Sequence, residues 1–279
     1  MVDEVIGVRV QPTQTDGALE RLLPKLGRYL ENVRSVRRVA DVGADDVLAW
    51  VDAPLSGGGR PSLATRHNRR TVARQGFRLL REIGAVDHDP TLDMRLPPRT
   101  PAREARPLSD KEVQLGRAAS LRTLAETRLP SVWALAEATA TTQEMPRLLP
   151  EHVDLNRGTV MLGGSSKTDA REASLTDWGT RILQLRLRSH SDPRAAVVYQ
   201  GSGDSSVSMQ SSCSRALGRI LAEAGLQRDN SVKPGSVRAW AGQRVWQETG
   251  RIEEVTRALG CRTLDTAADI IGLHWRAAQ

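Results

Sequence analysis

The arginines of this chain are the residues with the clearest capacity to bind a ligand. One predicted helix carries six of them at short intervals with few acids between: Arg66, Arg69, Arg70, Arg74, Arg78 and Arg81. A guanidinium stays charged at neutral pH, and its planar N–H groups match phosphate oxygens. A solvated helix would more often place Glu at i,i+4 to form supportive pairs. The pattern therefore favours a helix that lies against phosphates, with a solvated helix as the alternative.

Residues that could act as nucleophiles or metal ligands are few and scattered. The chain has two cysteines and five histidines, none at the spacing of a metal cluster. Its two tyrosines are Tyr29, which falls on the apolar face of a predicted helix, and Tyr199. Cys261 has no histidine beside it, so we expect a small buried apolar residue rather than a reactive thiolate. We expect no cofactor and no metal.

Composition points to a polyanionic partner. The formal net charge is +7 and the isoelectric point is near 10.2, which favours nucleic acid first and a membrane surface second. Arginine richness can also reflect a GC-rich genome. No signal peptide is visible, and no apolar run approaches the ~18 residues of a membrane span. We therefore expect a cytoplasmic, nucleoid-associated protein that does not bind membranes.

The first part of the chain is predicted to be a small helical domain. Apolar spacing indicates helices over 17–33, 44–53 and 62–84, after a polar tail at 1–16. Ser62 is a predicted N-cap and Gly84 a predicted stop. These observations place a small helical domain at 17–94, and the arginines of its last helix make it the expected DNA-binding domain.

A basic, proline-rich segment at 95–107 is predicted to be an extended connector. In this segment, Arg99 and Arg103 are expected to bind phosphates where the connector crosses the DNA backbone. The alternative is a linker that is only solvated. The larger domain is predicted over 108–279. Ser109 and Glu112 have capping-box spacing. Helical patterning runs over 131–148, and a β-hairpin is predicted from 158 to 175. Further helices are predicted at 177–188, 209–225, 236–248, 251–259 and 263–275. The expected fold is mainly α, in two domains, with a small antiparallel sheet.

Two stretches near the C-terminus, 235–240 and 257–266, resemble the end of a tyrosine recombinase of the phage integrase family. The match retains Arg238. Gly235 and Cys261 stand where the family has histidines, and Ile270 stands at the position of the nucleophilic tyrosine.

A second box, 138–154, resembles the family's first arginine motif. Aligning Glu144 with the family's glutamate leaves Thr141 at the position of the first catalytic arginine. In the following hairpin, Lys167 resembles the family's β-turn lysine. The resemblance covers almost the whole chain, with 17–90 similar to the core-binding domain and 108–279 similar to the catalytic domain.

The resemblance implies strand cleavage through a phosphotyrosine, with arginines that clamp the phosphate. The replacements at Thr141, Gly235, Cys261 and Ile270 lead us to expect a protein that is not an enzyme, with no catalytic residues. Lys167 and Arg238 can hold a phosphate without reacting with it. Alternatively, Arg238 fixes its helix through a salt bridge and Lys167 only solubilises a loop.

The predicted function is sequence-specific binding of double-stranded DNA by a catalytically inactive integrase-fold protein, as a transcriptional regulator or an accessory or architectural factor. The predicted DNA contacts are Arg66, Arg69, Arg70, Arg74, Arg78, Arg99, Arg103, Lys167 and Arg238, and self-association on DNA is possible. Two alternatives stay open: a divergent active recombinase, and a helical interaction module that does not bind DNA.

Overall fold

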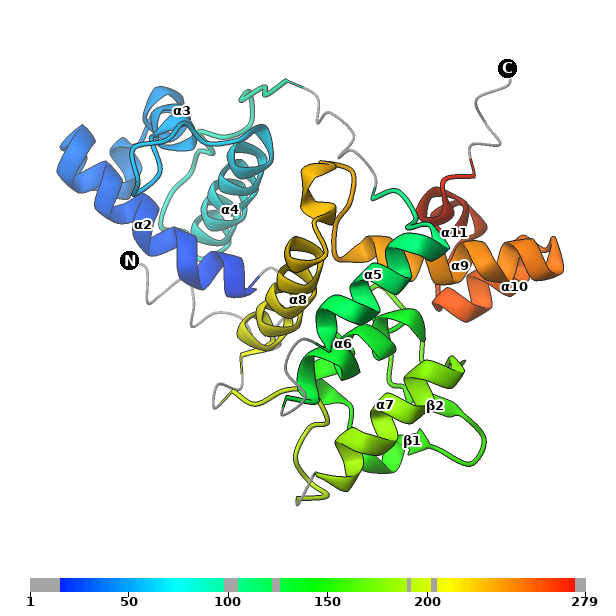
Figure 1. Cartoon of the computed structure of the whole chain (residues 1–279). Coiled ribbons are helices and arrows are strands. Elements are labelled where there is room, and N and C mark those ends of the chain that lie inside the picture. Colours follow the sequence, from blue (N-terminus) through cyan, green and yellow to red (C-terminus); the bar gives the residue numbers. More distant parts are fainter. Residues whose placement is uncertain (1–15, 98–104, 122–125, 190–191, 202–204, 274–279) are drawn as a thin grey trace. The chain divides into compact units, whose positions relative to one another are not determined.

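The computed structural model describes residues 16–97, 105–121, 126–189, 192–201 and 205–273 (Figure 1). The chain forms two compact units, Met1–Ala102 and Arg103–Gln279, called unit 1 and unit 2 from here on. The division falls inside the segment 95–107.

The described part of unit 1 is a set of helices around one apolar core. They are α2 (Asp16–Arg34), α3 (Ala44–Asp52) and α4 (Leu63–Glu82), with the 3-10 turn η1 (Val39–Asp41) after α2. These bounds confirm the predicted helices. The helix α4 begins where the Ser62 side chain accepts a hydrogen bond from the Thr65 amide, and the chain turns after it at Gly84, which has a φ of +70°.

Unit 2 is larger and mainly helical. Its described helices are α5 (Asp110–Ser120), α6 (Arg128–Glu137), α7 (Asp177–Arg188), α8 (Ser206–Glu223), α9 (Gly235–Thr249), α10 (Ile252–Leu259) and α11 (Leu264–Ile271), with 3-10 turns η2 (Met145–Arg147), η3 (Pro150–His152) and η4 (Leu226–Arg228). The capping box of α5 is present, because Ser109 and Glu112 bond each other's backbone amides. The helix α11 ends earlier than predicted, where Gly272 takes a φ of +73°.

A small antiparallel sheet accompanies these helices. Its strands are β1 (Val153–Asp154), β2 (Thr159–Leu162) and β3 (Arg171–Ser174), in the order β1-β2-β3. In the register, Val160 pairs with Ala173 and Leu162 pairs with Arg171. The inward residues of β2 and β3 are buried, while the residues between them are exposed or half-buried, which is the alternation expected of a half-buried hairpin. The predicted fold class, mainly α with a small antiparallel sheet, is confirmed.

The predicted helical stretch at 131–148 is wrong after Glu137. The helix α6 ends there, and Thr139 adopts a φ of +66°, which a helix cannot contain. The Glu144 side chain then accepts a hydrogen bond from the Thr141 amide, so a tight turn replaces helical bonding. The apolar spacing that suggested a helix reflects burial of this turn, since Met145 and Leu148 are buried.

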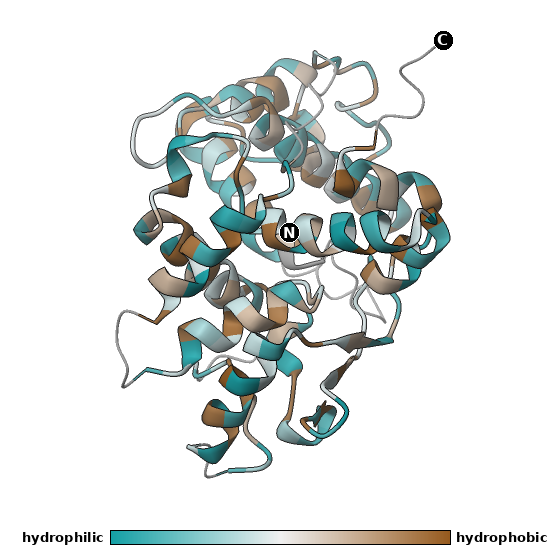
Figure 2. Ribbon diagram, turned by 45° about the vertical axis from the view of Figure 1, so that its right-hand side comes forward, coloured by the Kyte–Doolittle hydropathy of each residue, from teal (hydrophilic) through white to brown (hydrophobic). Residues whose placement is uncertain are grey.

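Each unit has its own core. In unit 1, Leu23, Leu26, Val47, Trp50 and Phe77 are among the buried residues. Unit 2 has one large cluster around α6 and α8, and a smaller one where α10 and α11 pack on α9. Figure 2 shows polar and apolar residues alternating along the helices, as expected when one face of each helix meets a core. Among the described residues, no helix is long and apolar enough to cross a membrane.

Candidate nucleic-acid interface

The helix α4 does not present all its arginines to solvent. Arg69 points toward α3, where its Nη1 donates to the carbonyls of Trp50 at 2.9 Å and Ala53 at 2.6 Å. Its guanidinium also lies 5.6 Å from the centre of the Trp50 ring. Burial lowers the pKa of Arg69. The structure therefore gives Arg69 a structural role, because its Nη1 supplies a donor to the C-terminal carbonyls of α3. The phosphate contact of Arg69 stays a prediction.

Two further arginines of α4 are paired with acids. Arg66 forms an ion pair with Asp52 of α3, and Arg78 pairs with Glu82 one turn along the helix. The expectation of a helix face nearly free of acids is corrected here, because Asp52 comes from another helix and could not be seen in the spacing along α4. Arg74 is exposed and forms no ion pair with any described residue. Arg70 has a buried Nε that meets no acceptor in the described part of the chain.

A second basic face, on α2, escaped the sequence analysis. Arg21, Lys25, Arg28 and Asn32 follow one another at spacings of four, three and four residues and are all exposed. Such spacing places them on one side of a helix. Arg21 and Lys25 pair with no acid among the described residues. These side chains line a hollow of about 970 Å³ whose other walls are the end of α3 with the segment after it and the first turns of α4. The available signal was the repeated spacing of three and four residues between cations, which places them on one side of the predicted helix.

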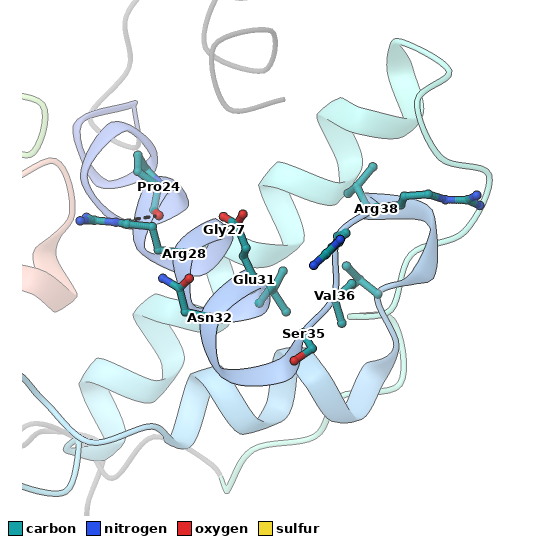
Figure 3. Close-up of a pocket in the computed structure, with 12 residues that line it drawn as sticks. Pro24, Gly27, Arg28, Glu31, Asn32, Ser35, Val36 and Arg38 are labelled. Atoms are coloured by element: carbon teal, nitrogen blue, oxygen red, sulfur yellow. Dashed lines mark hydrogen bonds between the residues drawn. The ribbon is translucent and has the colours of Figure 1, made fainter.

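The α2 face also borders another hollow, next to the turn that follows α2 (Figure 3). Its cations do not converge. Arg28 folds back so that its Nε donates to the Pro24 carbonyl at 3.4 Å, while Arg38 points to the opposite side and pairs with Asp41. A small anion would need donors aimed at one point. This hollow therefore extends a basic surface and does not form a compact ligand site.

The ends of the connector are attached to the units. The carbonyl of Pro97 lies 2.9 Å from Nε2 of His67 on α4. At the other end, Arg106 binds Glu112 at 2.6 Å and Asp229 at 2.7 Å. This arginine holds the pKa of Glu112 down at about 2. Arg106 is thus committed to unit 2. Of the predicted contacts in the connector, Arg99 and Arg103 lie outside the described residues.

In unit 2, the positions that the sequence analysis singled out lie on several different elements. The Thr141 hydroxyl accepts a hydrogen bond from the Glu144 amide at 3.3 Å, completing a reciprocal pair. Lys167 is exposed in the turn between β2 and β3, and Gly235 is exposed at the start of α9. Cys261 is buried, as predicted. Ile270 lies partly buried at the edge of the small cluster around α10 and α11.

Arg238 is held by backbone carbonyls. Its Nε donates to the Thr139 carbonyl at 3.1 Å. Its Nη2 donates to the Leu259 carbonyl and lies 3.8 Å from the Cys261 sulfur. Burial lowers the pKa of Arg238. The alternative of a salt bridge is not what the structure shows, because the guanidinium is bonded directly to no described carboxylate.

Sequence reasoning missed the residue with the most contacts in this region, Arg171 of β3. Its side chain is 5% exposed, and its guanidinium forms an ion pair at 2.8 Å with Glu144, whose side chain is fully buried. The same guanidinium bonds the carbonyls of Thr139 and Ala258. An arginine at an inward position of a strand that alternates in burial was the available signal.

Comparisons with known proteins identify the fold of this chain. No protein-family model matches the sequence, and no curated protein sequence matches it. A lambda integrase dimer bound to a COC′ core site is similar with a TM-score of 0.69 and 13% identity, over 99% of this chain and 95% of that one.

Two further solved structures are similar to this chain. The Tn1549 transposon integrase in complex with transposon right end DNA gives a TM-score of 0.63 at 11% identity, over 100% of this chain and 99% of that one. The XerH recombinase bound to palindromic difH gives 0.64 at 16% identity, over 91% and 75%. The chain has the fold of tyrosine recombinases and integrases.

This finding contradicts one prediction. The sequence led us to expect a protein that is not an enzyme, but the structures with the same fold are those of recombinases and integrases. The replacements at Thr141, Gly235, Cys261 and Ile270 do not show a loss of activity. The alignment of Ile270 with the nucleophile stays a prediction.

Proposed function

We propose that this chain binds double-stranded DNA in a sequence-specific way, as an accessory or architectural factor in recombination or as a regulator of transcription. The observation that carries the proposal is the exposed cationic face of α2, Arg21, Lys25 and Arg28, in a chain with this fold. Cations without acidic partners release the counterions of DNA when they meet its phosphates, and this release favours binding.

In the proposed complex, residues of both units and of the connector bind DNA phosphates. In unit 1, Arg70 and Arg74 of α4 join the α2 face as phosphate contacts, and Arg66 and Arg78 join them if they leave their acids. In unit 2, Lys167 and Arg238 hold phosphates. The connector contributes Arg99 and Arg103. Joining two modest sites in one chain raises the effective concentration of the second once the first is bound.

The test is the affinity for short duplexes measured by fluorescence anisotropy across a range of salt concentrations. We expect log K to fall steeply with log salt for random duplex DNA. Duplexes selected from a random pool by repeated binding should then compete much better than the starting pool, because specific complexes are typically at least ~10³ tighter than non-specific ones. Binding without a salt dependence, or a pool that never enriches, would refute the proposal.

Strand exchange by the chain itself is a second candidate function, favoured by the recombinases and integrases that share the fold. A nicked suicide substrate separates it from binding alone, since a covalent intermediate survives a denaturing gel. The same gel with the selected duplex tests the two functions on one ligand. We further propose self-association on DNA, which the stoichiometry of the complex in analytical ultracentrifugation would measure.

A further inference from the structure

Arg171 has no donor left for a ligand. A guanidinium carries five N–H groups, one on Nε and two on each terminal nitrogen. Here Nε donates to the Ala258 carbonyl at 3.1 Å, and Nη1 donates to Glu144 at 2.8 Å and to the Asp169 carbonyl at 3.1 Å. Nη2 donates to the Thr139 carbonyl at 2.8 Å and to the second Glu144 oxygen at 3.3 Å. Whatever Arg171 does for binding, it does through other groups.

Arg238, by contrast, keeps one edge free. Its Nε and Nη2 are bonded to Thr139 and to the end of α10, but Nη1 meets no acceptor among the described residues. The two arginines share their supports. Both donate to the Thr139 carbonyl, and they bond the consecutive carbonyls of Ala258 and Leu259.

The backbone is shaped to admit this arrangement. Gly260 has a φ of +64°, and a Cβ atom there would lie 2.6 Å from Nη1 of Arg171. Any other residue would push the guanidinium away from the end of α10. Thr139 holds its own left-handed conformation while its hydroxyl donates to the Ala258 carbonyl at 2.7 Å. Backbone strain of this kind persists where the surroundings over-determine it.

The charges of the group do not balance. Glu144 supplies one negative charge for the two guanidiniums of Arg171 and Arg238, and the described contacts of both arginines include no other carboxylate. A partly buried excess of positive charge is costly unless an anion neutralises it. The free edge of Arg238 is the place where such an anion can bind.

We propose that Arg171 is a positioning residue for Arg238. It fixes the Thr139 carbonyl and the end of α10, and these groups hold Arg238 with its Nη1 edge directed at a DNA phosphate. The inference rests on the proposed DNA binding and assigns the anion recognised in unit 2 to a phosphodiester oxygen.

A double-mutant cycle on the full chain tests the proposal. The proteins are the wild type, R171K, R238A and the double variant, and the ligand is a short random-sequence duplex. The readouts are the thermal midpoint and the slope of log K against log salt. R238A should weaken binding about tenfold and lower the slope by roughly 0.9, the value of one phosphate contact.

R171K keeps a charge beside Glu144, but one ammonium cannot reach the carbonyls of Thr139 and Ala258 together. It should therefore lower the slope as much as R238A does, and add nothing when combined with it. A purely structural role would move the thermal midpoint and leave the slope unchanged in a folded protein. Equal losses of affinity from R171K in both backgrounds, or an unchanged slope, would overturn the proposal.

E144D provides a second route if R171K does not fold. The shorter carboxylate should draw Arg171 away from the Thr139 carbonyl, and the same criterion applies to its slope. The proposed DNA binding and the proposed role of Arg171 can be refuted separately. A wild type that shows no salt-dependent binding refutes the proposed function. A wild type that binds normally while R238A matches it refutes only the assignment of Arg238 and Arg171.

Discussion

The basic face of α2 and the arginine pair of unit 2 both consist of cationic side chains, but these lie in opposite surroundings. Arg21, Lys25 and Arg28 are exposed, and their long side chains can follow a phosphate backbone of any sequence. Arg171 and Arg238 are fixed by carbonyls and by Glu144 at the ends of α6 and α10. The exposed cations should supply affinity that salt weakens, while the fixed pair should supply a contact at one defined point.

The same contrast predicts that mutations in the two regions have different main effects, on folding stability in one and on DNA affinity in the other. An exposed cation that lacks a partner contributes little to folding, because water solvates it equally well in the unfolded chain. A buried cation that loses its partner leaves an uncompensated charge or carbonyl. Mutations in unit 2 should therefore change stability first, and mutations on α2 should change DNA affinity first.

The largest expected effect is on the buried ion pair. R171M should lower the free energy of unfolding by about 3–5 kcal/mol, because it leaves the Glu144 carboxylate buried without its partner. Urea unfolding followed by circular dichroism would measure this. The matched control is E172Q, which breaks the exposed pair that Glu172 forms with Arg157 at 3.0 Å. Its cost should stay within about 0–1 kcal/mol, and similar losses in the two variants would remove the contrast.

The next effect concerns binding by the α2 face. R21A/K25A should lower the slope of log K against log salt by roughly 1.8, which corresponds to two lost phosphate contacts. R219A/R244A removes the same charge from exposed arginines that are each paired with a glutamate one turn away. If that control lowers the slope equally, net charge and not the α2 face governs binding.

How far the sequence could predict this molecule follows from which interactions are local. Helix bounds in unit 1 were predictable because caps such as Ser62 act within a few residues. The end of α6 was not, because the turn at Thr139 is supported by Ala258 and Arg171, which are distant in the sequence. After Glu137, the apolar periodicity correctly predicted buried residues but wrongly predicted that they form a helix.

The candidate site shows the same division. A run of arginines in α4 was visible in the sequence, but the partners of Arg66 and Arg69 come from α3 and were invisible. The α2 face was missed because its cations are spread over several turns and are separated by apolar residues. In unit 2 the resemblance led to Arg238. The inward position of Arg171 on β3 was a signal in the sequence, but its partners Thr139 and Ala258 are far away along the chain and could not be predicted.

A smaller effect distinguishes two neighbours on α4. R69M should cost about 1–3 kcal/mol of unfolding free energy, because the carbonyls at the end of α3 lose their donor, and it should leave the salt slope unchanged. R74A should do the reverse, lowering the slope by roughly 0.9 with a change in stability of at most about 0.5 kcal/mol. Thermal unfolding and anisotropy titrations on both variants decide between the roles. A lowered slope for R69M would restore it to the DNA contacts.

The smallest predicted effect tests the attachment of the connector to unit 2 by its dependence on pH. Bonding to Arg106 lowers the pKa of Glu112 from 4.5 to about 2 in the folded protein. A group whose folded pKa is depressed stabilises the fold above its unfolded pKa, and this stabilisation is lost as the pH falls through the folded value. Stability should therefore decline between about pH 4.5 and pH 2, with Glu112 contributing on the order of 1–2 kcal/mol.

In E112Q the same interval should show a shallower decline, measured by urea unfolding at each pH. The control E151Q removes an exposed glutamate for which the structure provides no arginine partner, and it should follow the wild-type curve. A wild-type slope in E112Q would mean that the bond between Glu112 and Arg106 does not set this pH dependence.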